Sequence, residues 1–272
     1  MAGITPCAEP LATSVRDLKM FMKLVTDFGP WRFDSSVIFS PWRAVTSKSS
    51  LRLGLNQEDA HFPLHPPVLR TLKQATEKLQ ASGHEIVPLA TPSIKEACAL
   101  AFHMFYMDPA LTTARHIAAS GEPTIPALTS TALPHEYMQY DPAPLTLDGL
   151  YDLNVLRNKF KEEFRSMIVQ AGIDAIIMPG YQGTAQPHDV FGSVPYTVLL
   201  NLLDYPASIV SFGQADKTVD AAFLRNVDYK SPYIADAVEG APCCVQLVGR
   251  NMRDEELVEV TQAVADVLAP KP

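Results

Sequence analysis

Three short apolar runs within residues 173–250 constrain the fold more than any other feature of this sequence. The runs cover residues 174–179, 201–206 and 240–250, and each is bounded by Pro or Gly. Runs of this length are typical of buried strands, because a helix needs about 10–12 residues or more. Helical patterns separate them. The sequence therefore predicts an α/β fold, with a mixed, mainly parallel sheet and helices on both faces.

Helical periodicity marks the other elements in chain order. Ser14 and Asp17 form a capping-box pattern at the start of a helix whose expected inner stripe is Val15, Leu18, Met22 and Val25. A helix over residues 66–81 joins strands expected over 51–55 and 85–89, a unit that crosses right-handed into a parallel pair. We expect one domain over residues 1–272, with an irregular, proline-rich excursion at about 121–145 and further helices over 93–107, 109–119, 146–171, 194–203 and 253–268.

Composition narrows the class of protein. Hydrophobic residues make up 47% and charged residues 19% of the chain, which suits a sizeable core. The net charge of −8 argues against nucleic acid or an anionic membrane as partner. The few scattered cysteines predict reduced thiols. Because the start lacks the pattern of a signal peptide, and no apolar run reaches the ~20 residues of a membrane span, we expect a cytoplasmic protein.

The loop over residues 180–193 is the best candidate site, since it leaves the carboxyl end of a predicted parallel strand, where open α/β sheets bind ligands. We expect Tyr181, Gln182 and Phe191 to contact a substrate. His188 is a candidate general acid or base, with Asp189 beside it to set its tautomer. Adjacent side chains rarely hydrogen-bond to each other, which favours a structural or pocket-lining role for the pair.

Polar residues before the next predicted strand form a second group of candidates. Asn201 and Tyr205 are predicted substrate contacts, and Asp204 is a third predicted catalytic residue. Asp204 could instead cap the turn ahead of the Tyr205–Pro206 pair. His103, Met104 and Tyr106 are further predicted contacts on an apolar helix, and the alternative for all three is core packing.

No metal or other cofactor is expected. His61 and His65 have the spacing of a helical ligand pair, but Pro63 between them disfavours the helix that the pair needs. Cys243 and Cys244 are neighbours in a predicted strand and should face opposite sides, so packing explains them better than a shared thiol site does.

Short motifs in a fixed order give the sequence a resemblance to a known family. They are Gly-Ile-Thr-Pro at 3–6, the segment 10–18, Pro-Trp-Arg at 41–43, His-Pro-Pro-Val-Leu at 65–69, Gly-His-Glu-Ile-Val at 83–87 and the three apolar runs. Together they resemble the C-terminal half of the amidase signature family, in the form of the fungal general amidases and acetamidases. The resemblance implies the C-terminal portion of that α/β fold and places residues 180–193 at the border of an acyl-binding pocket.

The resemblance also implies what the chain lacks. The family keeps its Ser-cis-Ser-Lys triad and a Gly-Ser-rich signature in the other half, and no Gly-Gly-Ser occurs here. Serines at 35–36 and 49–50, the latter after Lys48, lack the flanking glycines that form an oxyanion hole.

Three hypotheses for the function follow from this comparison. The first is a repurposed enzyme that transforms a small hydrophobic molecule by positioning and acid/base catalysis, as in cyclisation, isomerisation or dehydration. The second is a non-catalytic binding or regulatory partner of an intact amidase. The third is half of a split amide hydrolase. Half of a sheet leaves an edge and an apolar face uncovered, so we also expect a homodimer, or a partner that fills the missing half.

Overall fold

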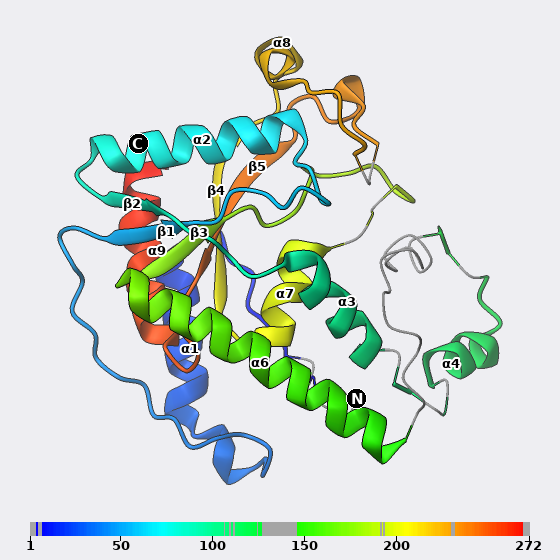
Figure 1. The fold of residues 1–272 in the computed structure, drawn as a ribbon. Helices are drawn as coiled ribbons and strands as arrows, with labels where there is room; N and C mark the ends of the chain where they lie inside the picture. Colours follow the sequence, from blue (N-terminus) through cyan, green and yellow to red (C-terminus); the bar gives the residue numbers. More distant parts are fainter. Residues whose placement is uncertain are drawn as a thin grey trace.

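The computed structural model describes residues 4, 7–105, 107–108, 110, 112–123, 125–126, 146–190, 192, 194–229 and 232–268. Its centre is a five-stranded sheet in the order β2-β1-β3-β5-β4 (Figure 1). The strands are β1 (Arg52–Leu55), β2 (Glu85–Pro88), β3 (Ala175–Met178), β4 (Ala207–Gln214) and β5 (Pro242–Val248).

The sheet is mixed and mainly parallel, which confirms the predicted fold class. Strand β1 runs parallel to both β2 and β3. Strand β5 runs antiparallel to β3 and to β4. Because β4 reverses the direction of β5, it points the same way as β1, β2 and β3, and only β5 runs against them.

Helices cover both faces of the sheet. The long ones are α1 (Val15–Phe28), α2 (Pro66–Ala81), α3 (Ile94–Phe105), α4 (Thr112–Ser120), α6 (Leu147–Ala171), α7 (Pro195–Leu203) and α9 (Asp254–Leu268), and the short ones are η1 (Pro30–Arg32), α8 (Lys217–Asp220), η3 (Ala221–Phe223) and η4 (Ala235–Ala237). Helices α2 and α9 pack on one face, against β4 and β5. Helix α7 lies on the other face, where the Gln246 side chain reaches the Tyr196 carbonyl, and α3 and α6 pack on α7 (Figure 1).

Local sequence signals set most helix ends as predicted. The Ser14 hydroxyl accepts a hydrogen bond from the Asp17 N–H at 3.2 Å and begins α1. Gly172 follows the last turn of α6 with φ 61°, a left-handed conformation that favours glycine. The stripe predicted for α1 is wrong in part, because this helix packs mainly on α9 and leaves Val25 45% exposed.

The second apolar run is not a strand. Helix α7 continues through Leu203, and Asp204 ends it in the left-handed conformation with φ 61°. Strand β4 begins only at Ala207. The prediction of a buried strand over residues 201–206 was wrong because a short apolar run fits a buried helix equally well. A strand was expected after Tyr205, but without bounds, because one face of β4 is exposed, which breaks the continuous apolar pattern.

Two further expectations concern the chain as a whole. Most of the excursion expected at 121–145 lies outside the described residues, so its character and the single-domain prediction stay untested. Among the helices that the structure describes, none combines the length and the apolar character that crossing a bilayer requires.

Candidate functional site

A cavity of about 220 Å³ opens where the chain leaves the carboxyl end of β3. The loop after β3 forms one wall, α2 forms a second and the first residues of β5 form the third. Its lining consists of small, apolar and thiol side chains, namely Val68, Gly180, Tyr181, Gly183, Thr184, Ala185, Pro242, Cys243 and Cys244. This cavity lies beside the loop over residues 180–193, and the roles predicted for that loop stay predictions.

Two glycines allow the loop to pass this close to its neighbours. A Cβ atom on Gly180 would lie 3.1 Å from the Ile209 Cδ1 atom, which is tighter than an ordinary contact. A Cβ atom on Gly183 would lie 2.8 Å from the His65 Nδ1 atom and would also collide with the Gln186 amide. Glycine is therefore required at position 183 for steric reasons.

His65 ties the loop to the start of α2. Its backbone N–H donates to the Gln182 carbonyl at 2.8 Å, and its ring nitrogen Nδ1 lies 3.4 Å from the Gln186 Nε2 atom. The ring also packs against Tyr229 and Tyr233, with centroids 5.1 and 5.3 Å away. The His65 side chain is buried, so its packing fixes the position of the loop that forms the cavity wall.

Buried polar atoms without partners occur beside the cavity. Within the described part of the chain, the Thr184 hydroxyl and both polar atoms of the Gln182 carboxamide are buried and make no hydrogen bond. Thr184 lines the cavity, whereas Gln182 lies directly behind the wall at 1% exposure. Buried polar groups are almost always paired, so a water or a ligand group is the natural partner for this hydroxyl.

The thiols in the lining are neutral at physiological pH. Burial raises the pKa of the Cys243 thiol, and burial together with the neighbouring Cys243 raises the pKa of the Cys244 thiol. Because the thiolate is the reactive form, neither cysteine is an activated nucleophile. The two are neighbours in β5, where Cys243 is buried and Cys244 is half-buried. The cavity can hold a small group, but its lining residues offer no charge to it.

The three predicted catalytic residues do not share one site. His188 and Asp189 are exposed on the loop, and Asp189 has φ 67°. Asp204 lies at the far end of α7, about 13 Å of helix away for nine residues. There its carboxylate is 3.6 Å from the Lys161 ammonium and its carbonyl accepts from Asn251 at 2.5 Å. Helix α7 therefore lies between Asp204 and His188, and the catalytic roles of all three residues stay predictions.

The predicted substrate contacts also lie in different parts of the structure. Tyr181 lines the cavity, and its hydroxyl accepts from the Gly192 N–H at 2.9 Å. His103 and Met104 are buried in the core on α3, and burial lowers the pKa of His103. Asn201 is exposed on α7 and Tyr205 is half-buried after it, so neither lines the cavity. The remaining two candidates, Phe191 and Tyr106, lie outside the described residues.

The sequence analysis missed several lining residues, above all Thr184 and the two cysteines as pocket residues. One signal could have found Thr184: the run Gly-Thr-Ala at 183–185, in the loop that follows a buried strand, leaves room for a ligand. Among the described residues, no group of three or more His, Cys, Asp or Glu side chains could hold a metal ion.

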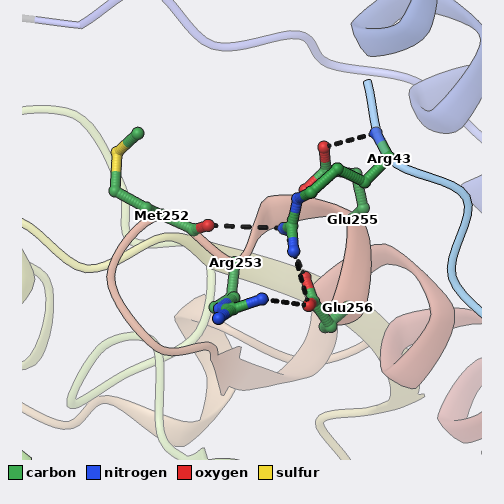
Figure 2. Close-up of polar contacts among 5 residues, drawn as sticks. All are labelled: Arg43, Met252, Arg253, Glu255 and Glu256. Carbon is green, nitrogen blue, oxygen red and sulfur yellow. Dashed lines mark hydrogen bonds and ion pairs between the residues drawn. The ribbon is translucent and has the colours of Figure 1, made fainter. Parts of the chain in front are cut away.

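A second polar region lies at the opposite end of the sheet and fixes the segment before β1. The Arg43 backbone N–H donates to Glu255 at 2.9 Å, and its guanidinium binds Glu255, Glu256 and the Met252 carbonyl (Figure 2). Arg253 donates to Glu256 at 2.9 Å. The hydrogen bonds that Arg43 donates to Glu256 and Glu255 raise the pKa of Arg43. This network holds the segment around Arg43, which precedes β1, against the start of α9.

A cavity of about 360 Å³ adjoins this network. Its charged lining residues already bind one another or the backbone: Lys48 pairs with Asp174, Arg253 pairs with Glu256, and Arg250 donates to the Ile173 carbonyl. We therefore regard it as structural and take the cavity after β3 as the candidate site.

Comparison with known proteins identifies the scaffold. The family model described as Amidase matches residues 2–258. An amidase of Gibberella moniliformis is 33% identical over 267 residues, which cover 98% of this chain and 48% of that protein. An acetamidase of Emericella nidulans is 29% identical, over 95% of this chain and 50% of its own length. The solved structure of a fatty acid amide hydrolase has a TM-score of 0.82 at 25% identity, over 96% of this chain and 48% of that one.

These matches identify the family and show how much of each relative the chain covers. The chain spans about half the length of the curated relatives it matches. The named relatives are amidases or an amide hydrolase, so they give no support to the non-hydrolytic lyase or isomerase reaction that we expected. With its sequence matched over residues 2–258 and its fold shared with an amide hydrolase, the chain belongs to the amidase family.

Proposed function

We propose that this chain forms the acyl-binding wall of an amide hydrolase of the amidase family. The observation that carries the proposal is the cavity after β3, at the carboxyl end of a parallel strand, in a chain that matches the amidase family over residues 2–258. The reaction we propose is hydrolysis of a carboxamide to a carboxylic acid and ammonia. The serine nucleophile and lysine base would come from the part of the scaffold that this chain does not span.

The size of the cavity points to a short acyl group. Its volume of about 220 Å³ lies below the range of about 300–1,000 Å³ that is usual for drug-sized ligands. Val68, Ala185 and Pro242 give it apolar contacts, and the Thr184 hydroxyl offers one hydrogen bond. A linear carboxamide of a few carbons, such as butyramide, suits this lining.

The proposal replaces the non-hydrolytic hypothesis. Catalysis by His188, Asp189 and Asp204 would need them around one substrate, and α7 separates the third from the other two. In addition, none of the three lines the cavity. A cytoplasmic location, expected from the cysteine content, stays part of the proposal and is tested by fractionation of the host cell.

Binding to the isolated chain tests the proposal. We expect butyramide to bind with a dissociation constant of about 1 mM, or about −4 kcal/mol, which is typical of so small a ligand. In ¹⁵N NMR titrations, the amide signals of Gly180, Gly183, Thr184 and Cys244 should shift in a saturable manner. Shifts confined to other residues, or no saturable shift, would refute the assignment of the cavity.

A matched pair of cysteine variants controls for non-specific binding. Cys244→Phe places a ring in the cavity and should abolish the shifts. Cys7→Phe adds the same ring at an exposed cysteine outside the cavity and should leave them unchanged. Far-UV circular dichroism of both variants checks that the fold is retained.

A further inference from the structure

Thr184 places a free hydroxyl group in the wall of the cavity after β3. The residue is 9% exposed and lines the cavity, and its Oγ1 atom makes no hydrogen bond within the described part of the chain. The Tyr181 hydroxyl in the same lining already accepts from the Gly192 N–H at 2.9 Å. The two thiols are weak donors and weak acceptors. Thr184 therefore offers the strongest hydrogen bond that this lining leaves unused.

The loop holds Thr184 in place, so its hydroxyl stays at the cavity wall. Two residues earlier, the Gln182 carbonyl accepts from the His65 N–H at 2.8 Å. Gly183 is enclosed by His65 and Gln186, and even a Cβ atom there would lie 2.8 Å from the His65 Nδ1 atom. A threonine side chain is also stiff at χ1, because it branches at Cβ. The hydroxyl is therefore a fixed feature of the wall.

A second unpaired polar group lies in the same loop. Both polar atoms of the Gln182 carboxamide are buried without a hydrogen bond among the described residues, and the residue is 1% exposed. Buried polar groups almost always have a partner, so each exception needs an explanation. Here the exceptions occur two residues apart, beside one cavity. This arrangement indicates a wall that meets a hydrogen-bonding group, either of a ligand or of ordered water.

The surroundings of Thr184 select a neutral group rather than an ion. No residue of the described lining carries a charge. Arg70 and Asp220, which act electrostatically on Cys243 of the lining, already pair with each other at 2.6 Å. A buried ion without a counter-charge is costly, whereas a neutral group needs only a hydrogen-bond partner. An apolar group is also disfavoured, because it would leave the Thr184 hydroxyl buried and unpaired.

We propose that Thr184 is a specificity-determining residue, which makes the cavity prefer amides of short acids that carry a hydroxyl group at the far end of the acyl chain. A hydroxyl both donates and accepts, so the Thr184 hydroxyl can bond to such a ligand in either sense. The inference rests on the proposed function, because it takes the cavity as the acyl-binding wall. The preference itself is measured by binding, without any activity.

Three amides of equal size test the preference on the full chain at neutral pH. They are γ-hydroxybutyramide, pentanamide and γ-aminobutyramide, which have the same number of non-hydrogen atoms and end in a hydroxyl, a methyl and an ammonium group. The three dissociation constants come from saturable shifts, in ¹⁵N NMR titrations, of the amide signals of Gly180, Gly183, Thr184 and Cys244. We expect γ-hydroxybutyramide to bind about tenfold more tightly than either of the others, which is the effect of one buried hydrogen bond.

Three variants assign the preference to the hydroxyl. Thr184→Val keeps the shape of the side chain and removes the hydroxyl, so it should weaken γ-hydroxybutyramide about tenfold while pentanamide binds at least as tightly as before. Thr184→Ser keeps a hydroxyl and should keep the preference. Thr261→Val is the matched control, because that buried hydroxyl on α9 donates to the Leu257 carbonyl at 2.7 Å and lies outside the cavity. It should leave the three dissociation constants unchanged, and far-UV circular dichroism checks that each variant is folded.

The outcomes separate this inference from the proposed function. Equal or tighter binding of pentanamide by the unmodified chain would overturn the inference and retain the acyl-binding wall, with water as the partner of Thr184. Tighter binding of γ-aminobutyramide, or a preference that survives Thr184→Val, would overturn it as well. If none of the three amides causes saturable shifts, the proposed function fails and the inference fails with it. The comparison of the three amides needs no variant, so a variant that misfolds does not affect the test.

Discussion

The buried ion pair between Arg70 and Asp220 should stabilise the chain strongly, and its removal gives a sharp prediction. Arg70 on α2 donates through Nε to the Asp220 carboxylate at 2.6 Å and through Nη2 to the Gln214 carbonyl at 2.6 Å. The other Asp220 oxygen accepts from the Asp216 N–H at 2.8 Å. The side chains are 8% and 0% exposed, so solvent cannot replace either partner.

We predict that Asp220→Ala lowers the free energy of unfolding by about 3–5 kcal/mol, because it leaves the Arg70 charge buried and uncompensated. With a urea m-value of about 3 kcal/mol per molar, the unfolding midpoint should fall by about 1 M or more. The double variant Arg70→Met/Asp220→Leu removes both charges and should recover most of this loss.

Urea unfolding followed by circular dichroism measures both effects. A decrease below about 1 kcal/mol for Asp220→Ala would show that Arg70 finds water or another partner, which would refute the reasoning. A double variant no more stable than the single one would show that the loss comes from packing or from the Asp216 N–H rather than from the unpaired charge.

Three further predictions concern the site and its support. Gly183→Ala should cost about 1–3 kcal/mol in urea unfolding, because its Cβ would lie 2.8 Å from the His65 Nδ1 atom, and a neutral effect would mean that the loop can shift. Tyr196→Phe should cost about 1–3 kcal/mol by the same assay, since its buried hydroxyl donates to the Phe62 carbonyl at 2.8 Å and accepts from the Asp59 N–H at 3.0 Å. Burial raises the pKa of the Cys98 thiol from 9.0 to about 12. The unfolded chain therefore releases this proton first, and stability should fall as the pH rises from about 9 to about 12. Cys98→Ala should flatten that slope, and an unchanged slope would contradict the assignment.

The fold could be predicted where local signals were strong. The Ser14 and Thr146 caps and the left-handed glycines that follow α1 and α6 mark the ends of those helices, because capping depends on residues close in sequence. Buried strands β3 and β5 were visible as apolar runs. The prediction failed at residues 201–206 and did not give the bounds of β4, because burial on one face or two depends on partners distant in the sequence.

The candidate site was predicted only in outline. The loop after β3 was found, because the carboxyl end of a parallel strand is a general place for ligands. The side chains that line the cavity were largely missed, since Cys244 and Val68 come from elements that the sequence does not join. Polar residues such as His188 and Asp204 were chosen for their chemistry, although the helix predicted over residues 194–203 already lies between them.

Treatment of the purified chain with a serine-directed fluorophosphonate, alongside an assay for ammonia release from butyramide, tests the central claim most directly. The claim is that this chain supplies the acyl-binding wall and another part of the scaffold supplies the nucleophile. It predicts that no serine of the chain is modified and that no ammonia is released above the protein-free blank. Stoichiometric modification of one serine, together with amide hydrolysis that the modification abolishes, would contradict it.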